Sequence, residues 1–131
     1  SIFTASDLAK ALKHQELKCY ALKIGKFGGI QPALQFVRMA NARGMSVWMG
    51  GMYDTGISRR MHAAFQMLPG VVDAGDIGAT SRYFDVDVTD PPYTVERGTV
   101  TLERRGHEHG LGCALDRSAL SRVLIDQQTY E

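Results

Sequence analysis

Three short apolar runs, at residues 20–24, at 45–49 and within 71–77, predict β-strands in the first part of the chain. The run at 45–49 does not alternate with polar residues, which is typical of a strand buried on both faces. Between these runs, apolar residues recur at helical spacing. The order strand, helix, strand, helix, strand predicts βαβ units and therefore a parallel sheet.

Residues that begin and end helices lie where this order requires them. Thr4-Ala-Ser-Asp7 has the form of a capping box, and Pro32 is suited to a first helical turn. Gly44 follows as a glycine C-cap. Ser58 is expected to cap the helix that Pro69 ends.

After two consecutive prolines near residue 90, the pattern changes. Residues 93–95 and 99–102, around Arg97-Gly98, predict a β-hairpin. A final helix is expected to begin at Asp116 or Ser118. The chain is therefore expected to be α/β, followed by a small α+β tail.

Composition narrows the class of protein. The 131 residues suit one domain, and the net charge of +1 gives no signature of nucleic-acid or membrane-surface binding. An apolar run of the roughly 20 residues that span a bilayer is absent. Two cysteines without metal-type spacing favour a reducing, cytoplasmic location over a disulfide scaffold.

Lys23 is the first candidate for chemistry. It ends an apolar run and is followed by Gly25, Gly28 and Gly29 and then by a helix. Burial and neighbouring cations can lower the pKa of a lysine at such a strand end, which suits an acid/base role. The alternative is a lysine whose amine merely reaches water. The glycines match no phosphate-binding motif and favour close helix packing instead.

Gly50-Gly51-Met52 ends the second strand as Lys23 ends the first. Two glycines allow backbone N–H groups to approach a ligand, and a carboxylate would suit them; a simple tight turn is the alternative. Asp54, in the same loop, is as consistent with a solvated or capping role as with ligand contact.

Other polar residues are weaker candidates. Asp73 and Asp76 flank the third strand's end, where a carboxylate could face a ligand or cap a turn. His107-Glu108-His109 lacks a third ligand at recognisable spacing and favours a surface loop over a metal site. His14 and His62 are expected on exposed helix faces.

Five stretches together resemble the C-terminal third of an enolase-superfamily enzyme of the mandelate racemase/muconate lactonizing family. The branch they resemble includes N-acylamino-acid racemases and o-succinylbenzoate synthases. The stretches follow the family's order over nearly the whole chain: ALKIGKFGGIQPAL, GMSVWMGGMYDTGISR, LPGVVDAGDIGATSRYFDVDVTDPPY, RGTVTL and GLGCALD. The chain departs from the usual family pattern at Tyr53-Asp54 and at Ser58-Arg59-Arg60.

The resemblance implies the C-terminal portion of a (β/α)8 (TIM) barrel. Residues 1–90 would run from helix 5 to strand 8, and residues 91–131 would help to complete a separate capping domain. Lys23 matches the catalytic lysine of the sixth strand. The implied substrate contacts are Gly50, Gly51, Met52 and Asp76.

The implied reaction removes the proton α to the carboxylate of a small substrate, as a racemase, cycloisomerase or dehydratase does. The family uses a divalent metal, usually Mg²⁺, and a second lysine on the opposite face of the reacting carbon. The family's metal ligands and second lysine precede the region matched here, so we expect this chain alone to be inactive.

Three strands of a barrel leave unpaired edges, so we also expect self-association or pairing with the missing N-terminal part. A folded interaction module without enzymatic activity is the alternative function. A doubly wound nucleotide binder is a third possibility, which the lack of a phosphate motif disfavours.

Overall fold

The computed structural model describes residues 4–14, 16–72, 74–102 and 110–128. The chain divides into two compact units. The first unit is Ser1–Met52 with Met61–Ile77, and the second unit is Tyr53–Arg60 with Gly78–Glu131. The domain boundary expected at residue 90 stays a prediction.

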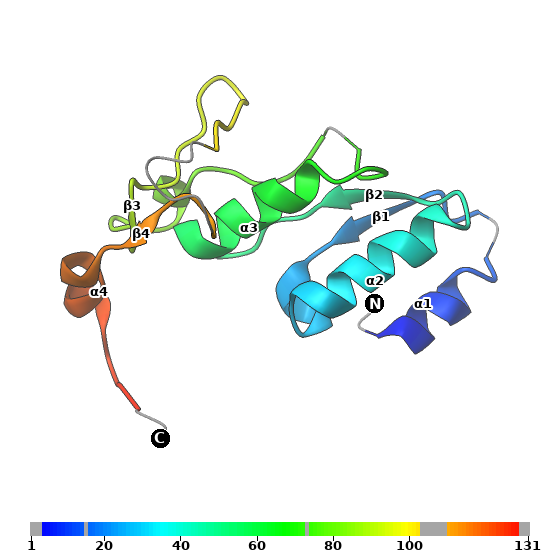
Figure 1. The fold of residues 1–131 in the computed structure, drawn as a ribbon, viewed down its shortest axis with the longest axis horizontal. Coiled ribbons are helices and arrows are strands. Elements are labelled where there is room, and N and C mark those ends of the chain that lie inside the picture. The colour runs from blue at the N-terminus through cyan, green and yellow to red at the C-terminus, as the bar shows by residue number, and fades with distance from the viewer. Residues whose placement is uncertain (1–3, 15, 73, 103–109, 129–131) are drawn as a thin grey trace. The chain divides into compact units, whose positions relative to one another are not determined.

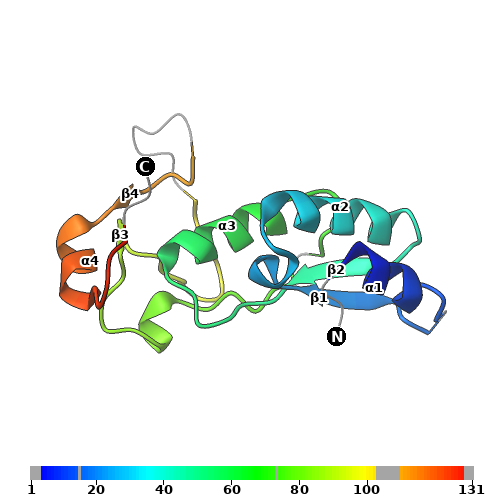
Figure 2. The same ribbon diagram turned by 90° about the horizontal axis from the view of Figure 1, so that it is seen from below.

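The first unit contains a parallel strand pair with helices packed beside it. Strand β1 pairs with β2 from Cys19↔Ser46 to Leu22↔Met49, and Figures 1 and 2 show α2 running alongside the pair. The predicted parallel arrangement is confirmed for these two strands. The elements, in order, are α1 (Ala5–Ala11), β1 (Cys19–Leu22), the 3₁₀ helix η1 (Ile24–Phe27), α2 (Ile30–Asn41) and β2 (Ser46–Met49).

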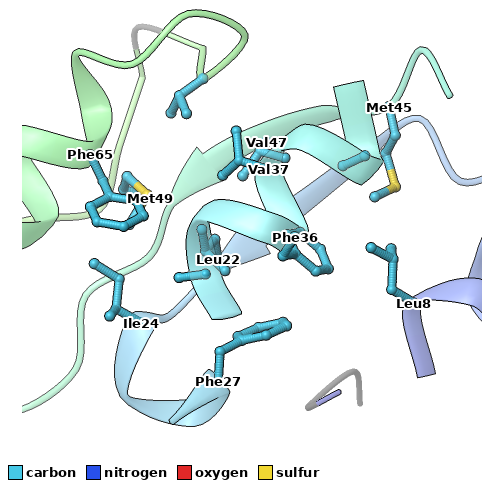
Figure 3. Close-up of a cluster of buried hydrophobic side chains, with 13 residues drawn as sticks. Leu8, Leu22, Ile24, Phe27, Phe36, Val37, Met45, Val47, Met49 and Phe65 are labelled. Carbon is cyan, nitrogen blue, oxygen red and sulfur yellow. The ribbon is translucent and has the colours of Figure 1, made fainter. Parts of the chain in front are cut away.

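A cluster of buried apolar side chains holds this unit together (Figure 3). Helix α2 contributes Ala33, Phe36, Val37 and Ala40, which recur at helical spacing and form its buried face. The whole cluster is Leu8, Leu22, Ile24, Phe27, Ala33, Phe36, Val37, Ala40, Met45, Val47, Met49, Phe65 and Val71.

The third predicted strand forms only in part. Residues 71–77 meet β2 in parallel at two isolated bridges, Val47↔Val71 and Gly50↔Asp76. The first strand also differs from its prediction, because it ends at Leu22 and Ile24 already begins η1.

The predicted helix ends are confirmed where the signal is local. The Thr4 side chain accepts from the Asp7 N–H at 3.1 Å, and the Asp7 carboxylate accepts from the Thr4 N–H at 3.1 Å. Pro32 lies in the first turn of α2, and Gly44 has a φ of 70° just beyond its end. Such a positive φ favours glycine.

The second unit has little regular structure. It contains the first turn of α3 (Gly56–Gln66), the 3₁₀ helix η2 (Thr80–Arg82), β3 (Thr89–Asp90), β4 (Ala114–Leu115) and α4 (Arg117–Val123). Strands β3 and β4 pair antiparallel and lie side by side in Figures 1 and 2. The sequence pattern did not predict this pairing.

The predicted hairpin of the second unit is reduced to its turn. Glu96 and Thr99 form an isolated antiparallel bridge and exchange both backbone hydrogen bonds, at 2.9 and 2.8 Å. Between them, Arg97 has a φ of 49° and Gly98 a φ of 80°, as a type I′ turn requires.

Of the two predicted starts for the final helix, Asp116 is confirmed. Its carboxylate accepts from the N–H groups of Ser118 and Ala119, each at 2.9 Å. Accepting these hydrogen bonds holds the pKa of Asp116 below its usual value, although burial works against the shift.

Two predictions for α3 are wrong. The helix begins at Gly56, so Ser58 lies inside it and does not cap it. His62 is buried, with 3% of its surface exposed, whereas an exposed position was expected. Ala63 and Phe65 of the same helix are buried as well, so His62 lies in a covered part of α3.

No helix in the part of the chain that the structure describes is both long and apolar enough to cross a membrane.

Candidate functional site

Lys23 lies at the carboxyl end of β1, between the strand and η1. Its backbone is still extended, with φ −125° and ψ 104°, and Ile24 then begins the 3₁₀ turn. The Lys23 side chain is half-buried, and its Nζ donates a hydrogen bond to the carbonyl oxygen of Gly51. The amine is therefore held over the end of the neighbouring strand.

Gly50 leaves the space that this lysine side chain occupies. A Cβ atom at Gly50 would lie 3.2 Å from Lys23 Nζ, 3.4 Å from its Cγ and 3.5 Å from its Cε. The shortest of these distances is tighter than ordinary van der Waals contact, so with a larger residue the amine would have to shift slightly. The glycine is explained by its neighbour Lys23.

The N–H groups of both glycines are used inside the sheet. The Gly50 N–H donates to Leu22 O at 2.9 Å, and the Gly51 N–H donates to Asp76 O at 2.7 Å. Both N–H groups therefore have partners within the sheet, and the space beside Gly50 is taken by Lys23. Contact of these glycines with substrate stays a prediction.

Asp76 joins the same edge from the third parallel segment. It bridges to Gly50, and its N–H donates to Met49 O at 2.9 Å. Asp76 is exposed. Met52, which follows the glycines, also has 44% of its surface exposed. The five predicted site residues therefore gather at the carboxyl ends of three adjacent parallel segments, the edge where parallel sheets bind ligands.

The remaining candidates do not extend this site. Asp73 and the His107-Glu108-His109 stretch lie outside the described residues. His14 is exposed and follows α1. Among the residues that the structure describes, three or more His, Cys, Asp or Glu side chains nowhere gather as they would around a metal ion. These residues therefore do not fit a Mg²⁺ site by themselves.

Asp87 is a second polar centre, and sequence reasoning missed it. In the second unit its carboxylate accepts from the Gly56 N–H at 2.9 Å and from the Tyr93 N–H at 2.8 Å. Burial works to raise the pKa of Asp87, but these N–H groups and the Thr80 and Thr89 hydroxyls outweigh it and lower the pKa. Asp87 thus caps α3 from 31 residues away, a distance at which local sequence carries no signal.

Two arginines of α3 are buried in the second unit. Arg59 is 1% exposed and donates through Nε to Asp54 O at 3.1 Å, while its guanidinium carbon lies 5.4 Å from the Tyr83 ring centroid. Arg60 is 4% exposed and donates through Nη2 to Pro91 O at 2.9 Å. Arg60, at which the sequence departs from the family pattern, therefore lines a cavity of about 540 Å³ in this unit.

Comparison with known proteins identifies the family. Residues 1–119 match the family described as Enolase C-terminal domain-like. The chain belongs to this family. The resemblance predicted from the five sequence stretches is confirmed, and the first unit is a mixed α/β portion of that domain.

Individual relatives agree with this assignment. An o-succinylbenzoate synthase from Enterococcus faecalis is 32% identical over 97% of this chain and 33% of its own length. An N-succinylamino acid racemase from Amycolatopsis is 34% identical over 70% of this chain and 25% of its own length. The crystal structure of an enolase-superfamily member from Enterococcus faecalis matches with a TM-score of 0.81 and 32% identity, over 92% of this chain and 32% of that chain.

The chain spans about a third of the length of the relatives it matches. By their names these relatives are enzymes, and both a synthase and a racemase occur among them.

Proposed function

We propose that this chain is the C-terminal barrel portion of an enolase-superfamily enzyme in which Lys23 moves the proton α to a carboxylate. The observation that carries the proposal is the Lys23 Nζ held at the carboxyl end of β1 by the Gly51 carbonyl. Membership of the Enolase C-terminal domain-like family and relatives named as synthase and racemase support it.

In the proposed mechanism the neutral amine of Lys23 takes the α-proton from one face of the substrate carbon, or its ammonium returns one. The hydrogen bond to Gly51 and the space left by Gly50 hold the amine in one place. Such positioning contributes to rate because the reacting atoms do not have to find one another. Met52 and Asp76, both exposed at this edge, would contact the substrate.

Magnesium is proposed only for the full-length enzyme. Since the described residues do not fit a Mg²⁺ site, its ligands would come from outside these residues, and the family resemblance implies a second lysine elsewhere in the enzyme. We also propose a cytoplasmic location, and that residues 91–131 help to complete a capping domain.

The decisive experiment compares Lys23→Ala with Lys18→Ala in the full-length protein. Lys18 is exposed immediately before β1 and serves as the matched control. The measurement is NMR of deuterium exchange at the α-carbon of N-succinylamino acids in D₂O. We expect Lys23→Ala to lower the exchange rate by about 10³-fold, in the range of lost acid/base catalysis, and Lys18→Ala to leave it unchanged.

Two outcomes would overturn this proposal. One is a Lys23→Ala exchange rate within twofold of the wild-type rate. The other is a wild-type full-length protein that exchanges no α-proton of these acids.

We also propose that the isolated chain self-associates or pairs with the remainder of the proposed full-length enzyme. Within the described residues, β1 pairs with β2 alone, so its other edge has backbone groups that a further strand could satisfy. Light scattering of the 131-residue chain should show dimers or larger species. A compact monomer at high dilution would refute self-association.

A further inference from the structure

The contact between β2 and residues 71–77 contains a gap in its strand pairing. From the bridge Val47↔Val71 to the bridge Gly50↔Asp76, β2 advances by three residues while the other segment advances by five. The other segment therefore has two more residues than β2 between the bridges and cannot pair with it one to one; we call its described residues Val72, Ala74 and Gly75 the bow. The Val72 N–H still donates to Val47 O at 2.8 Å, whereas the other backbone groups of the bow need partners elsewhere.

The side chain of Gln66, from α3, fills this gap. Its Oε1 accepts from the Met49 N–H at 3.3 Å, on the edge of β2 that faces the bow. Its Nε2 donates to Val72 O and to Ala74 O, the latter at 3.4 Å. A side-chain amide carries the same donor and acceptor as a peptide group, so Gln66 takes the place of a missing piece of strand.

Gly75 makes this insertion possible. A Cβ atom at Gly75 would lie 2.7 Å from Gln66 Oε1 and 3.3 Å from Met49 O. Real Cβ atoms essentially never come within 3.0 Å of another atom, so a larger residue here would require the Gln66 amide to shift. Gln66 and Gly75 are thus two complementary parts of one arrangement.

The arrangement leads directly to the Lys23 site. One residue beyond Gly75, the Asp76 N–H donates to Met49 O, and Asp76 O accepts from the Gly51 N–H. The carbonyl of the same Gly51 accepts from Lys23 Nζ. A chain of hydrogen bonds through Met49, Asp76 and Gly51 therefore connects the Gln66 amide to Lys23.

We propose that Gln66 is a positioning residue for Lys23. Its amide joins the bow to β2 by hydrogen bonds, and this fixes where Asp76 and the Gly51 carbonyl lie at the site. The inference rests on the proposed function, since it assigns to Gln66 the alignment of the same lysine. Gln66 touches neither the reacting atoms nor Lys23 in this role and acts through β2 and the bow.

The test uses Gln66→Leu, Gln66→Glu and Gly75→Ala in the full-length protein. Gln66→Leu removes the donor and the acceptor, and Gln66→Glu keeps the acceptor for Met49 but loses both donated bonds. Gly75→Ala should displace the amide without changing Gln66. The control is Gln35→Leu, on the exposed face of α2.

We expect Gln66→Leu and Gly75→Ala to lower kcat for α-proton exchange by at least about tenfold, the scale of a misplaced catalytic group. KM should change less than twofold, and the pH profile of kcat should shift. Gln66→Glu should lie between Gln66→Leu and the wild type, and Gln35→Leu should match the wild type.

A readout that needs no activity is the hydrogen-exchange protection of the Met49 and Gly51 amides. Both should lose protection in Gln66→Leu and in Gly75→Ala, but not in Gln35→Leu. If Gln66→Leu does not fold, Gln66→Glu and Gly75→Ala decide the question.

The inference is overturned if kcat and its pH profile stay at wild-type values in folded Gln66→Leu or in folded Gly75→Ala. Failure of the proposed function is distinguishable, because it would appear as undiminished exchange in Lys23→Ala. Lost exchange in Lys23→Ala with wild-type kinetics in the Gln66 and Gly75 variants would refute the positioning role alone.

Discussion

The two units of this chain are stabilised by different kinds of contact. The first unit has a cluster of 13 buried apolar residues beneath its parallel strands. Among the described residues of the second unit, more of the buried side chains are polar or charged than in the first unit: Arg59, Arg60, Thr80 and Thr89 are buried beside Val88, Tyr93 and Ala119. The first unit is built around apolar burial, whereas in the second unit the N–H groups of Gly56 and Tyr93 converge on the Asp87 carboxylate.

This difference determines how the stability around the candidate site should depend on pH. Apolar burial does not vary with pH, whereas a carboxylate that accepts several hydrogen bonds stabilises a fold only while it is ionised. Lys23 lies in the unit of the first kind, so acid should weaken the second unit before it disturbs the strand ends around Lys23. Four predictions test this contrast.

The largest effect is expected from Phe36→Ala in the first unit. Phe36 is 2% exposed, and its ring centroid lies 4.7 Å from that of Phe27 and 4.9 Å from that of Tyr20. Removing such a buried ring costs about 3–5 kcal/mol of unfolding free energy. Amide hydrogen exchange at Leu22 and Val47 measures the loss. Phe84→Ala, at a residue that is 36% exposed, is the control and should cost far less.

The second effect is expected from Asp87→Ala in the second unit. The variant leaves the N–H groups of Gly56 and Tyr93 without their acceptor, which should cost about 2–3 kcal/mol. Hydrogen exchange at Val88 and Thr89 should report the loss, while Leu22 keeps its protection. Asp85→Ala, at an exposed neighbour, is the matched control. Equal loss of protection in both units would contradict the contrast.

The third effect is a dependence on acid that only the second unit should show. The pKa of Asp87 is lowered in the folded state, so its contribution is complete above the usual carboxylate pKa and is lost as the pH falls through the folded value. Hydrogen exchange from pH 6 down towards pH 2 should show Val88 losing protection before Val47. Asp87→Asn should remove this part of the pH dependence. If the protection of Val88 falls with pH in Asp87→Asn just as in the wild type, the prediction is wrong.

The smallest effect is expected at the N-terminal cap. Thr4→Ala removes the side-chain acceptor of the Asp7 N–H and should destabilise α1 by about 1 kcal/mol. Thr4→Ser keeps the hydroxyl and should restore most of the loss. Thermal unfolding and amide hydrogen exchange at Leu8 measure the stability of α1 in both variants. A Thr4→Ser variant as unstable as Thr4→Ala would argue against the capping box.

Local features of the fold were predictable from the sequence. The capping box joins Thr4 and Asp7, three residues apart, and the Asp116 cap bonds within three residues. Such contacts depend on neighbours along the chain, so a short pattern is enough to predict them. The parallel pairing of β1 with β2 was also predictable, because apolar runs separated by a helix favour it.

The candidate site was predictable in its residues but not in its contacts. Lys23, Gly50 and Asp76 each mark the end of a parallel segment, and the order of those segments brings them together. The use of the Gly50 and Gly51 N–H groups inside the sheet was not predictable, because it depends on the register between segments. Register is a property of the pairing and not of either strand alone.

By itself the sequence determined the family, the caps of α1 and α4, the parallel pairing of β1 with β2 and the lysine at the end of β1. Only the tertiary structure decided that Gln66 joins β2 to residues 71–77, that Asp87 caps α3, and that His62 and Arg60 are buried. These contacts join residues 17 and 31 positions apart or depend on what packs over a helix face. The physical reason is that burial and long-range hydrogen bonds arise between elements, where no local pattern records them.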